Sequence, residues 1–342
     1  MTRLAAKFVE HPLNVADTDY RDRLLVLPGD VDPAFTQAGS LAPVVESLFV
    51  EQTASWQDLS ASFERLGRLS TCEVALDSTN VVVQLNERRA GRVKEGCFLD
   101  AENLPVEQRG IAVAGLFLAI NPFPILDRHL TGIHPVHTHQ SIDLLLHPAL
   151  TVSQALGPES AVFYNGPLAG ASAPQHAHIQ SVLFPKLPVE HSLERIDTSA
   201  FDRREGQSII YLPESLGRTV IAIESPDITA AERSTRAVIS ELPRHRDDPY
   251  DEPRLNLLIR TLADGTVRTL ITPRTEREVR IGIDSVLRPA TLEAVAGIMV
   301  VSSIEDYSHL GAGSEVVRHV YGATTRSSTE TRDALAPFNL AA

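Results

Sequence analysis

Apolar residues in the first half of the chain recur first at helical and then at strand spacing. From residue 42 to about residue 69 they return every three or four positions, which predicts two short helices with a break around residues 53–55. Residues 71–75 and 80–85 read as strands, and the continuous apolar run at 111–120 predicts one buried strand, stopped by Pro122 and Pro124. A helix is expected over residues 139–156, followed by strands at 161–164 and 176–184.

The second half repeats this pattern weakly. Strands are predicted at 209–212, 219–223 and 296–302, a helix at 230–242, further helices to about residue 321, and a hairpin of 254–260 with 266–271 around Asp264-Gly265. The mixture of helices and hairpins indicates an α+β fold with an antiparallel sheet. We expect an irregular arm at 1–40, two halves at 41–205 and 206–323, and a flexible tail at 324–342.

Composition excludes several classes of protein. Of 342 residues, 43% are hydrophobic and 22% charged, as in ordinary globular domains. The formal net charge of −13 argues against a broad nucleic-acid surface, and no apolar run is long enough to cross a bilayer. The N-terminal segment has no apolar signal core, and two cysteines, Cys72 and Cys97, favour a reducing compartment, so a cytoplasmic location is expected.

Histidines concentrate in one stretch: seven of the twelve lie between residues 129 and 178. The sharpest motif is HAHIQ at 176–180, where strand alternation would place His176, His178 and Gln180 on one face. The preceding loop contains Gly166 and Gly170, so its backbone can turn tightly and offer N–H groups to an anion. An imidazole beside such a loop can attack phosphorus and carry the group as a phosphoramidate. The plain alternative is a solvated strand face after a loop shaped by polar side chains.

Several further segments accompany this motif in a fixed order. They are QLNER at 84–88, CFLD at 97–100, NLPVEQ at 103–108, NPFPI at 121–125, RHL at 128–130 and EPRLN at 252–256. The ordered set resembles the histidine-triad superfamily, in the branch of galactose-1-phosphate uridylyltransferase and diadenosine tetraphosphate phosphorylase. It is most similar to a poorly characterised bacterial family of that branch. The resemblance implies a histidine-triad-like antiparallel sheet with flanking helices, duplicated into two halves as in the uridylyltransferases.

The resemblance also implies roles for individual residues. His178 matches the nucleophile, His176 precedes it in the motif, and Gln180 matches the amide that holds phosphate oxygens. Polar and glycine positions of the phosphate loop and of a segment near the nucleotide are matched by Asn165, Gly170, Ser172, Asn86 and Arg88. Asn165 and Ser172 could instead only shape a turn, and Asn86 and Arg88 could only end a strand. For Arg254 and Asn256 the sequence does not separate a functional role from a structural one.

Several relatives hold a structural zinc between two cysteines, a later histidine and the first histidine of the motif. The matching residues are Cys97, Asp100, His129 and His176, with Asp100 where a second cysteine is expected. Such a donor set is chemically suited to zinc, but the sequence leaves open whether the metal is retained. Cys97 could also be a small buried residue, and His134, His137 and His139 are expected to be exposed loop histidines.

The implied function is transfer of a nucleoside monophosphate, through a nucleotidyl-histidine intermediate, to a phosphate-bearing acceptor. Nucleotides with phosphate or sugar phosphate are the expected partners, no organic cofactor is expected, and a homodimer is compatible with the sequence. Two alternatives stay open: a hydrolase of nucleotides such as dinucleoside polyphosphates, and a nucleotide-binding protein without turnover. The sequence does not select the base or the acceptor.

Overall fold

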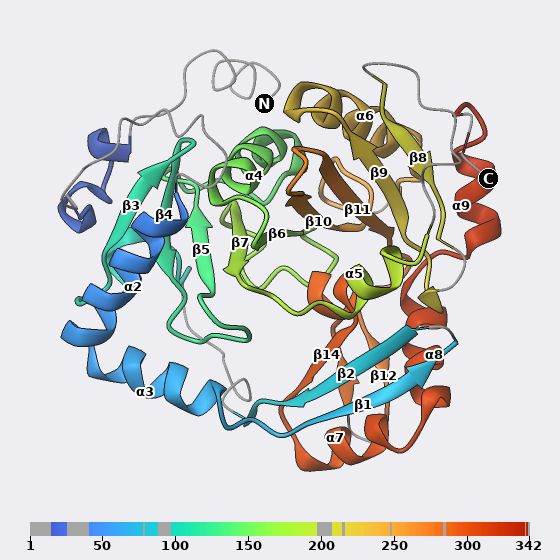
Figure 1. Ribbon diagram of the computed structural model, residues 1–342, viewed down its shortest axis with the longest axis horizontal. Helices are drawn as coiled ribbons and strands as arrows, with labels where there is room; N and C mark the ends of the chain where they lie inside the picture. The colour runs from blue at the N-terminus through green and yellow to red at the C-terminus, as the bar shows by residue number, and fades with distance from the viewer. Residues whose placement is uncertain are drawn as a thin grey trace.

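The structure, a computed structural model, describes residues 15–25, 41–77, 79–87, 97–196, 207–213, 216–246, 248–282, 285–338 and residue 340. A nine-stranded sheet crosses the molecule in the order β3-β4-β5-β7-β6-β10-β11-β9-β8 (Figure 1). Every neighbouring pair in it is antiparallel. The strands of its first half are β3 (Gly110–Val113), β4 (Leu116–Ile120), β5 (Leu130–Ile133), β6 (Ser160–Asn165) and β7 (His178–Leu183). Those of the second are β8 (Ile209–Tyr211), β9 (Ile221–Ser225), β10 (Leu255–Thr261) and β11 (Val267–Pro273).

The two halves of this sheet share one topology. In the first, β4 and β5 form a hairpin, helix α4 (Ile142–Leu156) follows, and β6 and β7 return with the order β4-β5-β7-β6. In the second, β8, β9, helix α6 (Ile228–Glu241), β10 and β11 give the matching order β8-β9-β11-β10. The halves meet where β6 pairs with β10, with Asn165 opposite Asn256. The repeated order supports the expected duplication.

Helices cover both faces of the large sheet, so its central strands are buried on both sides. Helices α4 and α6 lie side by side on one face, where Leu146, Leu150 and Val238 belong to the largest apolar core (Figure 1). Helix α5 (Pro188–Leu193) and the short π-helix η7 (Leu292–Ala296) contribute to a second core on the other face. Every residue of β6 and of β9 is buried, as expected for strands covered on both faces.

A second, three-stranded sheet joins distant parts of the chain. Strands β1 (Thr71–Leu76) and β2 (Thr79–Leu85) form a hairpin, and β14 (Ile298–Val301) pairs with β2 in parallel. Helices α7 (Ile304–Gly311) and α8 (Ser314–Thr324) pack on it, and β12 (Val279–Arg280) pairs with β13 (Val286–Leu287) nearby. Helices α2 (Ala42–Ser55) and α3 (Gln57–Leu66) lie at the β3–β4 side of the molecule (Figure 1).

Most predicted elements are confirmed, and three predictions need correction. The run at 111–120 is a hairpin rather than one strand, because Ala114 and Gly115 adopt positive φ values of 48° and 74° and turn the chain. Strand β7 begins at His178, so His176 lies in the preceding loop and not on the strand. Residues 328–334 form helix α9 instead of a flexible tail, and Ser327 with Glu330 makes a capping box at its start.

The N-terminal arm falls partly outside the described residues. Its described portion contains two single-turn 3-10 helices, Val15–Asp17 and Arg21–Arg23. Among the described residues, no helix combines the length and the apolar character needed to cross a lipid bilayer.

Candidate active site

The first residue of β7, His178, lies in the middle of the large sheet with its main chain held from both sides by Gln140. Gln140 Oε1 accepts a hydrogen bond from the His178 N–H at 2.8 Å, and Gln140 Nε2 donates to the His178 carbonyl at 2.9 Å. The same Nε2 donates to the carbonyl of Asn165 at 2.9 Å, which ties the end of β6 to the start of β7. Sequence reasoning missed Gln140, because a lone glutamine before a helix carries no motif.

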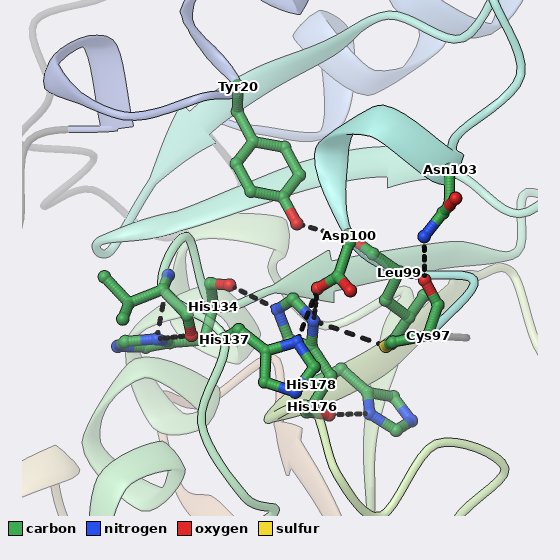
Figure 2. A network of polar contacts seen from close by, with 10 residues as sticks. Tyr20, Cys97, Leu99, Asp100, Asn103, His134, His137, His176 and His178 are labelled. Carbon is green, nitrogen blue, oxygen red and sulfur yellow. Dashed lines mark hydrogen bonds and ion pairs between the residues drawn. The ribbon is translucent and has the colours of Figure 1, made fainter.

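The imidazole of His178 has one bound and one unpaired nitrogen. Its Nδ1 lies 2.8 Å from the carbonyl oxygen of His176, so Nδ1 carries the proton and donates (Figure 2). Its Nε2 is buried and has no hydrogen-bond partner. Burial lowers the pKa of His178 to about 4, which keeps the ring neutral at neutral pH. A neutral imidazole with a free lone pair is the form that acts as a nucleophile.

Gln180 follows on the same face of β7, and His129 fixes the orientation of its amide. The main-chain N–H of Ile125 donates to His129 Nδ1 at 3.2 Å, so the proton of this ring lies on Nε2. His129 Nε2 then donates to Gln180 Oε1 at 3.1 Å. The Gln180 oxygen is thus engaged, and its amide nitrogen is the group that can donate to a ligand.

The loop between β6 and β7 contains the predicted phosphate-binding positions. Gly170 has a φ of +88°, and a side chain there would collide with Pro289 and Ala290, which lie within 3 Å of the position a Cβ would take. Asn165, at the end of β6, is buried, whereas Ser172 is exposed. The structure therefore brings Asn165, Gly170 and Ser172 beside β7, as the sequence predicts.

Two cavities meet at Ser172 and Gln180, which line both of them. The apolar cavity, of about 510 Å³, has Phe98, Leu104 and Phe123 among its lining residues. The polar cavity, of about 380 Å³, is lined by the phosphate loop and by residues of the second half of the chain. These last include Arg277, Arg288, Thr291, Glu293 and Asp306. A ligand with an apolar and an anionic part could span both cavities.

A cluster of metal-ligand type lies beside this site. Ligand atoms of Cys97, Asp100, His137 and His176 lie within 4.8 Å of one another. Figure 2 shows Cys97, Asp100 and His137 around His176. His176 Nε2 donates to the carbonyl of His134 at 2.8 Å, so its Nδ1 presents a lone pair. That Nδ1 lies 2.9 Å from Asp100 Oδ1 and 3.5 Å from Cys97 Sγ.

These donors fit a zinc ion. A lone pair that faces a carboxylate and a thiol is electrostatically unfavourable unless a cation or a proton lies between them. Two histidines, one thiol and one carboxylate form a suitable tetrahedral set, and a second ring nitrogen bound to a carbonyl is the usual support for such a ligand.

The structure corrects the expected ligand set at one position. His129 is engaged with Ile125 and Gln180, and His137 occupies the fourth position of the cluster instead. His137 is an exposed loop histidine, as expected, and its Nδ1 lies 2.6 Å from Asp100 Oδ1. His134 is buried rather than exposed, whereas His139 is exposed as expected. Residues 135–136 form a bend just before His137, so no regular spacing in the sequence marks this ligand.

Of the two residues expected in a segment near the nucleotide, Asn86 and Arg88, the structure describes only Asn86. Asn86 is buried and donates from Nδ2 to the carbonyl of Pro124 at 3.4 Å, within the NPFPI segment. It lines a smaller cavity, of about 270 Å³, which shares Phe123 with the apolar cavity. Arg88 lies outside the described residues.

Comparisons with known proteins agree on the fold. Residues 48–183 match a family described as a domain of unknown function (DUF4922). No curated protein matches this chain. Yeast Ap4A phosphorylase Apa2 is similar at 16% identity with a TM-score of 0.57, and the alignment covers 78% of this chain and 95% of the yeast chain. Its complexes with AMP and with Ap4A match with TM-scores of 0.55 and 0.52, also at 16% identity, covering 77% of this chain and 93% and 94% of theirs. The chain thus has a histidine-triad-like fold of the kind seen in this phosphorylase.

Proposed function

We propose that the protein is a nucleotidyltransferase or phosphorylase in which His178 carries the nucleoside monophosphate. The observation that carries this proposal is the buried, unpaired Nε2 of His178, whose ring is fixed by the Nδ1 hydrogen bond to the His176 carbonyl. A neutral ring with a free lone pair can attack phosphorus without a prior proton transfer. The similarity in fold to a phosphorylase of Ap4A supports the same reaction class.

The reaction has two balanced steps. In the first, the His178 Nε2 lone pair forms a bond to the α-phosphorus while the bond from that phosphorus to its bridging oxygen breaks. The leaving phosphate departs with that electron pair, and the His176 carbonyl stabilises the cationic imidazole through Nδ1–H. In the second, a phosphate oxygen of the acceptor attacks the same phosphorus, the P–N bond breaks, and neutral His178 is restored.

The cavities suggest how a substrate lies. The apolar cavity suits a nucleobase, because Phe98 and Phe123 offer aromatic and apolar surface. The polar cavity suits phosphate groups, and the amide of Gln180 lies at the junction. Gln180 cannot serve as a general acid or base, which favours a phosphate acceptor over water.

The cluster of Cys97, Asp100, His137 and His176 would hold a structural zinc. When bound, the metal would supply a rigid link between the loops at 97–100 and 134–137 and His176. The carbonyl of His176 accepts the hydrogen bond from the catalytic ring, so this link fixes the orientation of His178. No chemical step passes through the metal.

Trapping the intermediate tests the proposal. The wild-type protein is mixed with nucleoside diphosphate sugars or dinucleoside polyphosphates without acceptor, quenched in alkali, and analysed by mass spectrometry. We expect a nucleoside monophosphate adduct on His178 that survives alkali and is lost in acid. His178→Ala should lower turnover by about a thousandfold or more while nucleotide still binds. The control is His147→Ala, an exposed histidine of α4 paired with Glu232, which should keep full activity.

The same reaction mixtures identify the acceptor. Orthophosphate, a sugar phosphate or water is supplied, and the products are identified by mass. Release of free nucleoside monophosphate as the main product would indicate a hydrolase. Binding without any adduct or product, or an adduct on another residue, would contradict the proposal.

A further inference from the structure

A buried arginine of the second half, Arg274, lies at the start of a chain of side chains that ends in the polar cavity. Its side chain is 1% exposed and donates only to neutral oxygens. The acceptors are Asn256 Oδ1 at 2.6 Å and the carbonyls of Pro289 at 2.6 Å, Thr324 at 2.7 Å and Glu276 at 3.0 Å. Burial lowers its pKa to about 10, still well above neutral pH, so the guanidinium keeps its charge.

The direction of every hydrogen bond in this chain follows from groups that can only donate or only accept. Arg274 only donates, so the Asn256 atom that faces it is the oxygen. The carbonyl of Ala169 only accepts, so the Asn256 atom 2.6 Å from it is Nδ2. The same Nδ2 lies 3.1 Å from the side chain of Asn165.

The orientation of Asn165 is fixed in the same way. The main-chain N–H of Thr291 only donates, so the Asn165 atom at 2.7 Å is Oδ1. This oxygen also accepts from Asn256 Nδ2 and lies 2.7 Å from Thr291 Oγ1. With Oδ1 enclosed by these groups, the amide nitrogen of Asn165 is the part of the side chain left for the polar cavity, which Asn165 lines.

The side chain of Arg274 also supports the loop between β6 and β7, through residues 289–291. Arg274 donates to the carbonyl of Pro289, and Pro289 with Ala290 packs directly against Gly170. Two residues further on, Thr291 holds Asn165. The buried guanidinium of Arg274 thus contacts two parts of the second half that support the phosphate loop. One is Asn256, and the other is the segment at 289–291.

The charges around the cavity are mixed. Glu293 is the carboxylate that acts on Arg274, and its Oε2 accepts from the Ala290 N–H at 2.8 Å. Arg288 is paired with Glu278 at 2.7 Å. Arg277 also lines this cavity, so a substrate phosphate would meet both a cationic side chain and oriented donors such as the Asn165 amide.

We propose that Arg274 is a positioning residue for phosphate binding, which acts through Asn256 to turn the amide nitrogen of Asn165 toward a substrate phosphate. The inference rests on the proposed function for the identity of the substrate, but not for its phosphate chemistry. It assigns a role to Asn256 and to Arg274 in the second half of the chain.

Binding measurements on matched ligands test it. The affinities of adenosine, AMP, ADP and inorganic pyrophosphate are measured by calorimetry for the wild type, Arg274→Met and Asn256→Asp. Asn256→Asp keeps an acceptor for Arg274, removes the donor to Asn165 and Ala169, and adds a negative charge that pairs with the guanidinium. This variant keeps the test valid if Arg274→Met does not fold. We expect both variants to bind adenosine within about twofold of the wild type and AMP, ADP and pyrophosphate at least about tenfold more weakly.

The control is Arg268→Met, which removes a partly buried arginine of β11 that pairs with Glu190 and Glu224 instead. It should lower the unfolding midpoint without changing the ratio of AMP to adenosine affinity. An equal loss for adenosine and AMP, or unchanged AMP and pyrophosphate binding in both variants, would overturn the inference. Wild-type protein that binds pyrophosphate but no nucleotide would contradict the proposed function alone, and wild-type protein that binds neither would overturn both.

Discussion

At the scale of single residues, the carboxylate of Glu252 is buried close to the candidate site. It lies at the N-terminus of α4, where its Oε2 accepts from the Ile142 N–H at 2.8 Å, and the Tyr164 hydroxyl donates to its Oε1 at 2.8 Å. Burial raises the pKa of Glu252 to about 7, and Asp143 also raises it. The hydrogen bonds from Ile142 and Tyr164, together with the charge of Arg244, lower it by less.

This raised pKa predicts how stability depends on pH. The carboxyl loses its proton near pH 4.5 in the unfolded chain but only near pH 7 in the folded protein. Between these values the folded state binds more protons than the unfolded state, so the free energy of unfolding falls as the pH rises, by about 3 kcal/mol in total. Chemical denaturation from pH 4.5 to 8 measures it, and Glu252→Gln should remove most of this slope.

The control for this prediction is Glu159→Gln, which changes an exposed carboxylate of the same sheet region. It should leave the slope unchanged. The same pH profile in wild type and Glu252→Gln would show that Glu252 titrates normally.

At the scale of elements, the loop between β6 and β7 depends on the backbone of Gly170. Two glycines with nearly equal φ, Gly170 at +88° and Gly265 at +87°, differ in their surroundings. A Cβ at Gly170 would lie 2.7 Å from Ala290 Cα and from the carbonyl oxygen of Pro289, whereas nothing lies within 4 Å of a Cβ at Gly265. The second glycine is therefore a matched control for the first.

We expect Gly265→Ala to cost about 1 kcal/mol of unfolding free energy, from the positive φ alone. Gly170→Ala should cost about 3 kcal/mol or more, because backbone must also move. It should weaken pyrophosphate binding too, whereas Gly265→Ala should not. Equal effects of the two substitutions on stability and binding would show that Gly170 does not need its close contact with residues 289–290.

The elements that the sequence predicts correctly are those with a local signal. The Asp264-Gly265 turn sets the β10–β11 hairpin, and the apolar periods of α4 and α6 locate both helices. The turn at Ala114-Gly115 was missed because apolar residues surround it on both sides, so the run has no polar break.

Within the site, the sequence predicts groups that share a motif and misses groups brought together by the fold. The pair of His178 and Gln180 follows from spacing on one strand. The contact of Asn256 with Asn165 follows from the β6–β10 register, which no local pattern encodes. The contact of Arg274 with Asn256 follows from the pairing of β10 with β11, and the sequence carries no motif that marks these two side chains. The exchange of His129 for His137 has the same cause, since loop geometry rather than spacing decides which ring reaches Asp100.

At the scale of the whole molecule, the cluster of Cys97, Asp100, His137 and His176 joins three segments far apart in sequence. We expect protein purified without added metal to contain about one zinc per chain by elemental analysis, and chelation to lower the unfolding midpoint. His137→Ala should lose the zinc, whereas His139→Ala, an exposed histidine two residues away, should keep it. Asp100→Cys should bind zinc more tightly, because a thiolate is a softer ligand. Zinc far below one equivalent in the wild type, or equal loss in both alanine variants, would reject this site.

The seam between β6 and β10 has a consequence for how such a chain can evolve. Strand β6 of the first half pairs with strand β10 of the second half. Because both halves belong to one chain, they cannot dissociate on dilution. Two copies of one topology need only one set of reactive groups. The strand that corresponds to β7 in the second half, β11, has no histidine, and its neighbourhood provides Asn256 and Arg274 instead. Under the proposed function, a repeat without a reactive histidine is free to specialise in supporting the other repeat.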